Sequence, residues 1–220
     1  MPTLLDLYCG AGGCSVGYRR AGFDCIVGVD VNPQPRYPFA FVRADAIEYV
    51  KRYGDRFDAI HASPPCQRYC SLNAVWGNAH RHPDLVDATR EALLATGRPY
   101  VIENVPRSPL RGAVCLCGSS FGLGVRRHRL FETNWLVGDY PPACDHAGQG
   151  RVFGVYGRPG GNSLRDYHRR GRGGALRGST QDWREAMGID WMTGDELSQA
   201  IPPAFTQWVG ERLLKHLGGA

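Results

Sequence analysis

The sequence predicts an α/β fold in which helices cover both faces of a mostly parallel sheet. From the start to about residue 106, short apolar runs alternate with segments of helical spacing, which is the pattern of repeated strand–helix units. The chain has 220 residues, of which 43% are hydrophobic and 21% charged, so it is long enough to bury the core of one domain. A change in composition after Asn134 predicts a small irregular lobe beside that domain.

Five runs are predicted as strands because they are short, rich in apolar or β-branched residues and bounded by turn-forming residues. They are residues 3–9, 25–31, 39–45, 57–63 and 100–105. Two segments between them have helix-compatible spacing: residues 15–22, and residues 84–97, which open on Asp84 and close at Gly97 as helix ends often do. In such an arrangement, ligands bind at the carboxyl ends of the strands.

The later part of the chain has a different character. Residues 138–180 are rich in glycine, proline and arginine, and residues 151–178 hold seven arginines with a single acid, Asp166. This composition predicts an irregular basic lobe, with a solvated loop as the alternative. After a pair of prolines, residues 204–217 have apolar residues at helical spacing and are predicted as a helix.

The charge and the cysteines bear on partners and compartment. The formal net charge of +5 comes almost wholly from arginine, since lysine occurs only at positions 51 and 215. Guanidinium groups pair well with phosphate oxygens, so this charge fits a phosphate-rich partner, although a GC-rich genome also favours arginine. No apolar run approaches the roughly 18 residues of a membrane span. Without a secretory signal pattern at the start, the eight cysteines are expected to be reduced thiols of a cytoplasmic protein.

A glycine-rich turn follows the first predicted strand, in "DLYCGAGGCSVGYRRAG" at residues 6–22. Its glycines let the backbone turn sharply and approach a ligand, and the following helix offers unpaired N–H groups. Asp30 ends the second strand, where a carboxylate suits ribose hydroxyls, and Asp45 ends the third, where it could accept from an exocyclic amine. This set does not distinguish a methyltransferase from a dehydrogenase, and a plain tight turn is the alternative.

Cys66 follows the fourth predicted strand, behind Pro64 and Pro65 in "ASPPCQRYCS". The two prolines restrict the backbone, so the thiol is held in one direction at a strand end. That placement suits a nucleophile for covalent catalysis. The alternative is a small buried hydrophobic side chain, which is the usual fate of a free cysteine.

Glu103 interrupts the apolar run of the fifth predicted strand. A buried carboxyl whose pKa is raised can act as a general acid, and an ion pair with an arginine is the alternative. Downstream, Arg127 and Arg129 lie two residues apart in "FGLGVRRHRLFETN". If that segment is extended, both guanidinium groups point to one side, where they could bind an anionic substrate or hold Glu103, while His128 points away.

The ordered set of these motifs resembles the C5-cytosine-specific DNA methyltransferases. The order is glycine turn, Asp30, Asp45, Pro-Cys-Gln, Glu-Asn-Val, the arginine pair and "LSQAIPPAFTQWVGERL", and the resemblance covers residues 4–133 and 185–214. It implies a Rossmann-like class I methyltransferase fold. It also implies three parts: a catalytic and cofactor-binding core (1–133), a reduced target-recognition lobe (134–180) and a segment that returns to the core (181–220).

The resemblance implies a role for each matching residue. Cys66 is implied as the nucleophile, Glu103 as the contact to cytosine, and Arg127 with Arg129 as the arginine pair. The cofactor S-adenosylmethionine is implied to contact Asp6, Tyr8, Gly10, Gly12, Gly13, Asp30, Val31, Asp45, Ala46, Pro64, Ala200 and Ile201. The substrate is implied to contact Gln67, Ser71, Asn104, Arg151 and Arg158.

Some positions depart from the family pattern. Tyr8 stands where the family usually has phenylalanine, and Val125 where the arginine motif normally begins with glutamine. The loop after Cys66 has Tyr69 and Cys70 before its serine, where the family usually has phenylalanine directly before serine.

The implied activity is transfer of a methyl group from S-adenosylmethionine to carbon 5 of a flipped cytosine in double-stranded DNA, through a covalent Cys66 adduct. Its implied setting is restriction–modification in the cytoplasm of a bacterium or a phage-infected host cell. Three alternatives stay open at this point. They are action on RNA or a free cytosine nucleotide, a catalytically silent nucleic-acid-binding homologue, and a dehydrogenase.

No metal is predicted in the active site. A separate structural zinc site stays open at Cys115, Cys117, Cys144 and His146, which form "CLC" and "CDH". The one-residue spacing within each pair is shorter than the usual two to four residues of a zinc knuckle.

Overall fold

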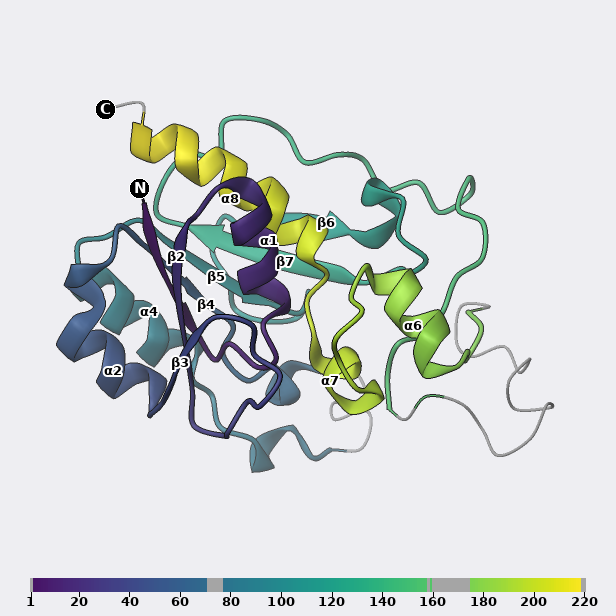
Figure 1. The fold of residues 1–220 in the computed structure, drawn as a ribbon, viewed down its shortest axis with the longest axis horizontal. Coiled ribbons are helices and arrows are strands. Elements are labelled where there is room, and N and C mark those ends of the chain that lie inside the picture. The colour runs from purple at the N-terminus through teal and green to yellow at the C-terminus, as the bar shows by residue number, and fades with distance from the viewer. Residues whose placement is uncertain (1, 71–76, 158, 160–174, 219–220) are drawn as a thin grey trace.

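The computed structural model describes residues 2–70, 77–157, 159 and 175–218 of the chain (Figure 1). Within them, one seven-stranded sheet has the order β3-β2-β1-β4-β5-β7-β6. The strands are β1 (Thr3–Leu7), β2 (Cys25–Asp30), β3 (Ala40–Arg43), β4 (Ala59–Ala62), β5 (Tyr100–Asn104), β6 (Val114–Cys117) and β7 (His128–Thr133). Neighbours among β1 to β5 are parallel, whereas β7 runs antiparallel to both β5 and β6. The fold is therefore the predicted Rossmann-like α/β architecture.

Helices cover both faces of this sheet, as predicted (Figure 1). The helices are α1 (Gly13–Ala21), α2 (Ala46–Tyr53), α4 (Val86–Ala95), α6 (Thr180–Met187), α7 (Gly194–Gln199) and α8 (Pro203–Gly218). The two-residue alternation of β1 divides the core: Leu4 packs in a cluster with residues of α1 and α8, whereas Leu5 and Leu7 pack with residues of α2 and α4. A strand that is buried on both faces is typical of a parallel sheet.

The predicted strands and helices are present, with shifted ends. The start of α4 was predicted wrongly: the helix begins at Val86, and Leu85 at its N-cap makes no side-chain cap. The carboxylate of Asp84 is instead engaged outside the helix, where it accepts a hydrogen bond from the Tyr69 hydroxyl and pairs with Arg68 at 3.3 Å. This contact ties the segment before α4 to the loop that follows Cys66.

Four elements were not predicted, namely β6, α2, α6 and α7. The two last helices carry capping boxes, in which Ser179 pairs with Asp182 and Thr193 pairs with Glu196. Helix α6 packs in a third apolar cluster with Phe153 and other residues of the irregular segment. Only an isolated bridge, Phe153 to Leu176, is assigned in the described residues between β7 and α6.

The antiparallel pair β6–β7 corrects the zinc set that the sequence left open. Its register places Cys117 opposite His128 and Cys115 opposite Leu130. Cys115 is exposed and lies outside the resulting side-chain cluster, whose members are Cys117, His128, Cys144 and His146. The cluster differs from the set that the sequence left open in one member, because the neighbour of Cys117 is His128 from the adjacent strand and not Cys115 from the same strand.

Helix α8 returns the end of the chain to its beginning. It packs against α1 so closely that a Cβ on Gly17 would lie 2.0 Å from Thr206 Oγ1 and 2.2 Å from the Pro203 carbonyl oxygen. At the same junction, a Cβ on Gly13 would lie 2.4 Å from the Ile201 carbonyl oxygen. These close approaches need glycine, and they bring the "AIPP" segment against the glycine turn.

No helix among the described residues is both long and apolar enough to cross a membrane.

Candidate active site

A cavity of about 940 Å³ opens at the carboxyl ends of the parallel strands and contains most of the predicted site. The predicted residues that line it are Asp6, Tyr8, Gly10, Gly13, Asp30, Val31, Pro64, Cys66, Gln67, Glu103, Arg127, Arg129, Ala200 and Ile201. The residues come from six separate stretches of the chain, which the sheet order and α8 bring together. This is the edge where open α/β sheets bind ligands.

The glycine turn and Asp30 form one wall of the cavity. Asp30 accepts hydrogen bonds from the backbone N–H of Gly10 at 3.1 Å and of Asn32 at 2.8 Å. Gly10 has a φ of +50°, and no atom lies within 4 Å of the place where its Cβ would stand. A ligand can therefore approach this backbone closely, and the neighbouring Val31 offers an apolar surface that is 61% exposed.

Tyr8 enters the turn in the left-handed region, with a φ of 57°. This conformation is rare for a bulky side chain and stores strain. The hydroxyl of Tyr8 lies 3.0 Å from Thr89 Oγ1 on α4, which fixes the ring at the cavity wall. The strained residue thus lies in the turn to which the sequence assigned cofactor binding.

Asp6 lies fully buried under the turn. Its Oδ2 accepts a hydrogen bond from Ser15 Oγ, which also lies 2.6 Å from the Tyr37 hydroxyl, whereas Oδ1 has no hydrogen-bond partner among the described residues. Burial raises the pKa of Asp6 to about 7 against the lowering effect of the Ser15 hydrogen bond. A buried acceptor without a partner, in the lining of a cavity, is a feature that a donor or cation from a ligand would satisfy.

The loop with Cys66 is held from β5. Asn104 Nδ2 donates to the Pro64 carbonyl oxygen at 2.9 Å, and the Asn104 side-chain oxygen accepts from the backbone N–H of Val105 at 2.9 Å. Cys66 then precedes a short 3₁₀ helix, Gln67–Tyr69. Its side chain is partly exposed in the cavity, so it is not sealed in the core.

The thiols of Cys66 and Cys70 lie 3.8 Å apart. The hydrogen bond between the two thiols and burial raise the pKa of Cys66, whereas Arg129 lowers it. The hydrogen bond to Cys66 lowers the pKa of Cys70 to about 6. Arg129 lowers the pKa of both thiols, so a thiolate on either sulfur is stabilised by a nearby guanidinium.

Glu103 faces Arg129 across the β5–β7 junction. Arg129 Nε lies 3.1 Å from Glu103 Oε1, but the geometry is not that of a hydrogen bond, so this buried oxygen has no hydrogen-bond partner among the described residues. Burial raises the pKa of Glu103 to about 7, although Arg129 lowers it. Of the two roles that the sequence left open for the arginine pair, Arg129 thus holds Glu103.

Arg127 has a different environment from Arg129. Its guanidinium group donates to the backbone carbonyl oxygens of Ser198 at 3.0 Å, Ala200 and Val155. Burial and Arg129 lower the pKa of Arg127 to about 9, which still leaves it cationic at neutral pH. Arg127 therefore fastens the irregular segment and the "AIPP" segment together at the rim of the cavity.

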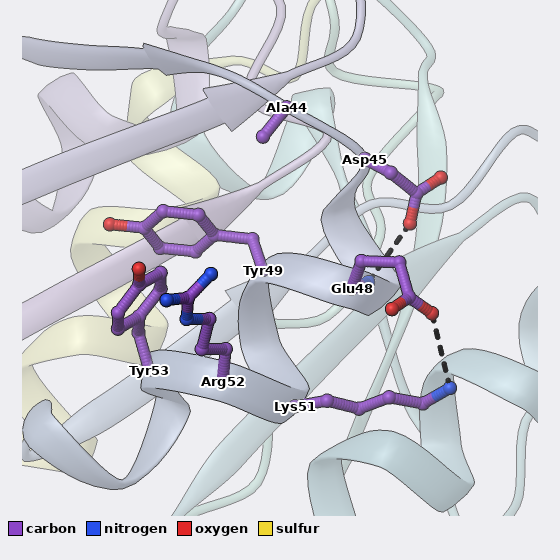
Figure 2. Close-up of a pocket in the computed structure, with 7 residues that line it drawn as sticks. All are labelled: Ala44, Asp45, Glu48, Tyr49, Lys51, Arg52 and Tyr53. Atoms are coloured by element: carbon purple, nitrogen blue, oxygen red, sulfur yellow. Dashed lines mark hydrogen bonds and ion pairs between the residues drawn. The ribbon is translucent and has the colours of Figure 1, made fainter.

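Some predicted residues lie elsewhere. Asp45 caps α2, accepting from the Glu48 N–H at 2.9 Å, and lines a separate hollow of about 380 Å³ with Tyr49 and Arg52 (Figure 2). Ala46 packs in the core beneath α2. Gly12 lies against Tyr37 and Pro38, and Asn104 is buried behind the loop it holds.

Of the predicted substrate contacts Ser71, Arg151 and Arg158, the structure describes only Arg151. Arg151 is exposed, and its guanidinium carbon lies 5.1 Å from the centre of the Phe153 ring, outside the cavity lining. Ser71 and Arg158 lie outside the described residues.

The sequence did not single out several lining residues. Cys9, Cys14, Asn32, Gln34, Ser63, Val105, Pro106 and the segment 152–156 are among them, and Cys70, also in the lining, was noted only as a departure from the family pattern. The segment 152–156 carried no recognisable motif. Cys70 lies four residues after Cys66, a spacing that brings two side chains together in a helical turn.

Comparison with known proteins gives a family match. Residues 3–107 match the family described as C-5 cytosine-specific DNA methylase. The chain is 26% identical over 145 residues to the type II methyltransferase M.XorII of Xanthomonas oryzae pv. oryzae, an alignment that covers 59% of this chain and 31% of M.XorII. It is 28% identical over 119 residues to the type II methyltransferase M.HgiGI of Herpetosiphon aurantiacus, with 48% of this chain and 92% of M.HgiGI covered. The chain thus spans about a third of the length of M.XorII.

Two solved structures share the fold over nearly the whole chain. The methyltransferase EhMeth of Entamoeba histolytica superposes with a TM-score of 0.62 at 13% identity and covers 99% of each chain. The Dnmt2 methyltransferase of S. pombe superposes with a TM-score of 0.63 at 15% identity and covers 98% of this chain and 99% of its own. At these identities the likeness concerns the fold alone.

Proposed function

Because the chain belongs to the C-5 cytosine-specific DNA methylase family, we propose that it transfers a methyl group from S-adenosylmethionine to carbon 5 of cytosine in double-stranded DNA. One observation carries the proposal. The glycine turn with Asp30 and the trio of Cys66, Glu103 and Arg129 line the same cavity, so a cofactor and a base can meet there.

The residues of the turn suit S-adenosylmethionine. The open space above Gly10, the buried Asp6 oxygen without a partner and the exposed Val31 offer a close backbone approach, a site for positive charge and an apolar surface. Asp30 retains acceptor capacity for ribose hydroxyls beyond its two backbone donors. When bound, the cofactor supplies an electrophilic methyl group on a positively charged sulfur.

Cys66 and Glu103 would activate the base. Carbon 5 of cytosine is a poor nucleophile until a nucleophile adds to carbon 6. The Cys66 thiolate makes that bond, while the proton of Glu103 is shared with N3 and takes up the charge that develops on the ring. Carbon 5 then carries the electron pair that attacks an electrophile. The carbon 5 proton then passes to solvent, the proton shared with N3 returns to Glu103, and departure of the Cys66 thiolate restores the aromatic ring.

Arg129 and Asn104 position these two groups. Arg129 favours the thiolate of Cys66 and contacts Glu103 at 3.1 Å, so it sets the charge balance between nucleophile and acid. Asn104 holds the loop through the Pro64 carbonyl oxygen. A cytosine reaches this cavity only out of the base stack, at a cost of a few kcal/mol that phosphate contacts to the arginines would offset.

The proposed activity is tested by transfer of tritiated methyl groups to duplex DNA. Wild-type protein and the Cys25→Ser variant are expected to label the DNA, because Cys25 is exposed and outside the cavity lining. Cys66→Ser is expected to bind the cofactor and to lose labelling by at least about 10³-fold, since a hydroxyl is a far weaker nucleophile at neutral pH. Labelling of DNA by Cys66→Ser would refute the assigned nucleophile.

The same assay separates the nucleic-acid substrates. Transfer RNA and a free cytosine nucleotide are offered in parallel with duplex DNA at equal cytosine concentration. Preference for duplex DNA supports the proposal, whereas preference for RNA or the nucleotide replaces it with one of the alternatives that the sequence left open.

A further inference from the structure

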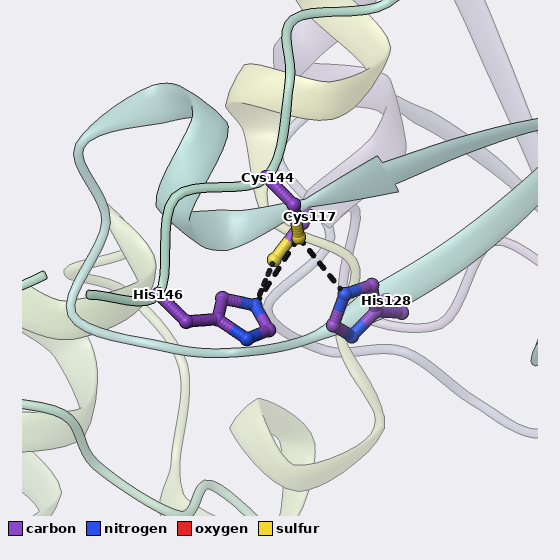
Figure 3. Close-up of side chains that lie close together, drawn as sticks. All are labelled: Cys117, His128, Cys144 and His146. Atoms are coloured by element: carbon purple, nitrogen blue, oxygen red, sulfur yellow. Dashed lines mark hydrogen bonds between the residues drawn. The ribbon is translucent and has the colours of Figure 1, made fainter. Parts of the chain in front are cut away.

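Two cysteines and two histidines, none of them assigned to catalysis, lie together at the end of the β6–β7 pair. They are Cys117, His128, Cys144 and His146, and Figure 3 shows their side chains pointing toward one another. Cys117 and His128 come from the two paired strands, and Cys144 and His146 come from the irregular segment that follows. One ligand atom from each residue lies within 4.8 Å of the others.

The distances among these atoms fit a tetrahedral metal centre. His146 Nε2 lies 3.3 Å from Cys117 Sγ and 3.2 Å from Cys144 Sγ, and His128 Nε2 lies 3.2 Å from Cys144 Sγ. Bonds of about 2.3 Å from zinc to sulfur and about 2.0 Å from zinc to nitrogen place tetrahedral sulfur and nitrogen ligands about 3.5 Å apart. The two imidazole rings, with centroids 5.2 Å apart, meet at 72° and do not stack.

The strand register explains why this set forms. Cys117 and His128 are directly paired across the ladder, so their side chains lie on the same face at the end of the hairpin. Cys115 lies two residues before Cys117 on β6 and is paired with Leu130. It therefore stays outside the cluster.

The surroundings hold the ligands in place. Ser119 Oγ donates to Cys117 Sγ at 3.2 Å, a contact that stabilises a metal-bound thiolate. Arg126 donates to the His146 carbonyl oxygen at 3.0 Å, and Ser120 donates to the Ala143 carbonyl oxygen at 3.0 Å. The loop that carries Cys144 and His146 is thereby docked on the segment between β6 and β7.

We propose that Cys117, His128, Cys144 and His146 bind one Zn²⁺ ion as a structural site. Two thiolates and two imidazoles complete a tetrahedron without a position for water, which is the mark of a structural rather than a catalytic zinc. Binding deprotonates both cysteines, and the protons pass to solvent.

The ion would fasten the irregular segment to β7, the strand that carries Arg129. His128 lies between Arg127 and Arg129 in sequence, and the described part of the segment between β7 and α6 has only one isolated bridge. A metal crosslink would supply the rigidity that this segment lacks in secondary structure. The inference does not depend on the proposed methyl transfer.

Metal analysis of the purified full-length protein tests the site. After gel filtration with a weak chelator, wild-type protein and the matched control Cys115→Ser are expected to hold about one zinc per chain. Cys117→Ser and His146→Ala are expected to retain less than about a tenth of that amount, because three ligands hold zinc far more weakly than four. Zinc lost equally from Cys115→Ser, or absent from the wild type, would overturn the proposal.

A cobalt spectrum provides the second readout and needs no variant. Wild-type protein loaded with Co²⁺ is expected to show intense visible bands of a tetrahedral ion together with thiolate charge-transfer absorption. A weak octahedral spectrum without charge transfer would overturn the site, as would peptide mapping that finds a disulfide between Cys117 and Cys144. Neither readout involves DNA or methyl transfer, so failure here is distinct from failure of the proposed function.

Discussion

At the scale of single residues, the site contains two buried carboxyl groups, each with one oxygen that has no hydrogen-bond partner among the described residues. Glu103 is 4% exposed and Asp6 is fully buried, and burial raises the pKa of each to about 7. Glu103 can therefore hold a proton near neutral pH, which a contact to cytosine N3 requires. The same burial opposes folding whenever these groups must ionise.

The raised pKa of Glu103 predicts how stability depends on pH. Below pH about 4.5 both the folded and the unfolded chain hold this proton, and between about 4.5 and 7 only the folded chain does. The stability contributed by the neutral carboxyl is thus lost as pH rises toward the folded pKa. Urea unfolding measures the free energy of unfolding at pH 5 and at pH 8. The decrease in this free energy from pH 5 to pH 8 is expected to be smaller in Glu103→Gln than in wild type by about 2 kcal/mol. If the free energy of unfolding of the two proteins depended on pH in the same way, the raised pKa of Glu103 would be contradicted. Asp6 is present in both proteins, so its contribution cancels in the comparison.

The placement of Cys66 and Glu103 at the cavity could be predicted because these residues break local patterns. Cys66 follows two prolines at a strand end, and Glu103 is an acid inside an apolar run. The contacts between distant loops could not be predicted, since nothing local links Tyr37 to Ser15 and Asp6. Asp45 shows the reverse case: it was predicted to end the third strand, but β3 ends at Arg43 and the Asp45 carboxylate caps α2 outside the cavity lining.

At the scale of elements, the junction of α1 and α8 positions the glycine-turn side of the cavity. Gly17 lies in the middle of α1, where alanine would ordinarily favour the helix by about 1 kcal/mol. Here a Cβ would meet Thr206 Oγ1 at 2.0 Å and the Pro203 carbonyl oxygen at 2.2 Å. A backbone oxygen cannot turn aside as a side chain can, so overpacking decides the outcome.

Gly17→Ala is therefore expected to destabilise the protein by about 1–3 kcal/mol despite its better helix propensity. Arg20→Ala is the matched control, because Arg20 is exposed on the same helix. Thermal or urea unfolding measures the stability of the two variants against the wild type. A Gly17→Ala variant as stable as the control would contradict the close packing of the two helices.

The strands of the parallel sheet could be predicted from their apolar runs, whereas β6 could not, since "VCLC" is four residues long and lies among turn-forming residues. Helices α6 and α7 are short, and their signal is the capping box at Ser179 and Thr193 rather than apolar spacing. His128 shows what a strand register adds. Its position between two arginines indicated a side chain turned away from them, but only the pairing with β6 reveals Cys117 as its neighbour.

At the scale of the whole molecule, the cavity is assembled from both ends of the chain. The glycine turn comes from the first residues, Cys66 and Glu103 from the middle, and Ala200 with Ile201 from the segment before α8. Arg127 joins the last of these to the irregular segment through backbone carbonyl oxygens. The order of motifs along the chain predicted this set, but the part that Arg127 plays in joining two segments emerges only from the three-dimensional arrangement.

In the proposed reaction, the Cys66 sulfur bonds to carbon 6 of a cytosine in DNA while a methyl group is added at carbon 5. The most direct measurement uses duplex DNA with 5-fluorocytosine at the target, because fluorine at carbon 5 cannot leave as the proton does and the adduct persists. With S-adenosylmethionine present, we expect a protein–DNA species that survives denaturation and whose modified peptide contains Cys66. An active protein that forms no such species, or one joined through another residue, would contradict the account.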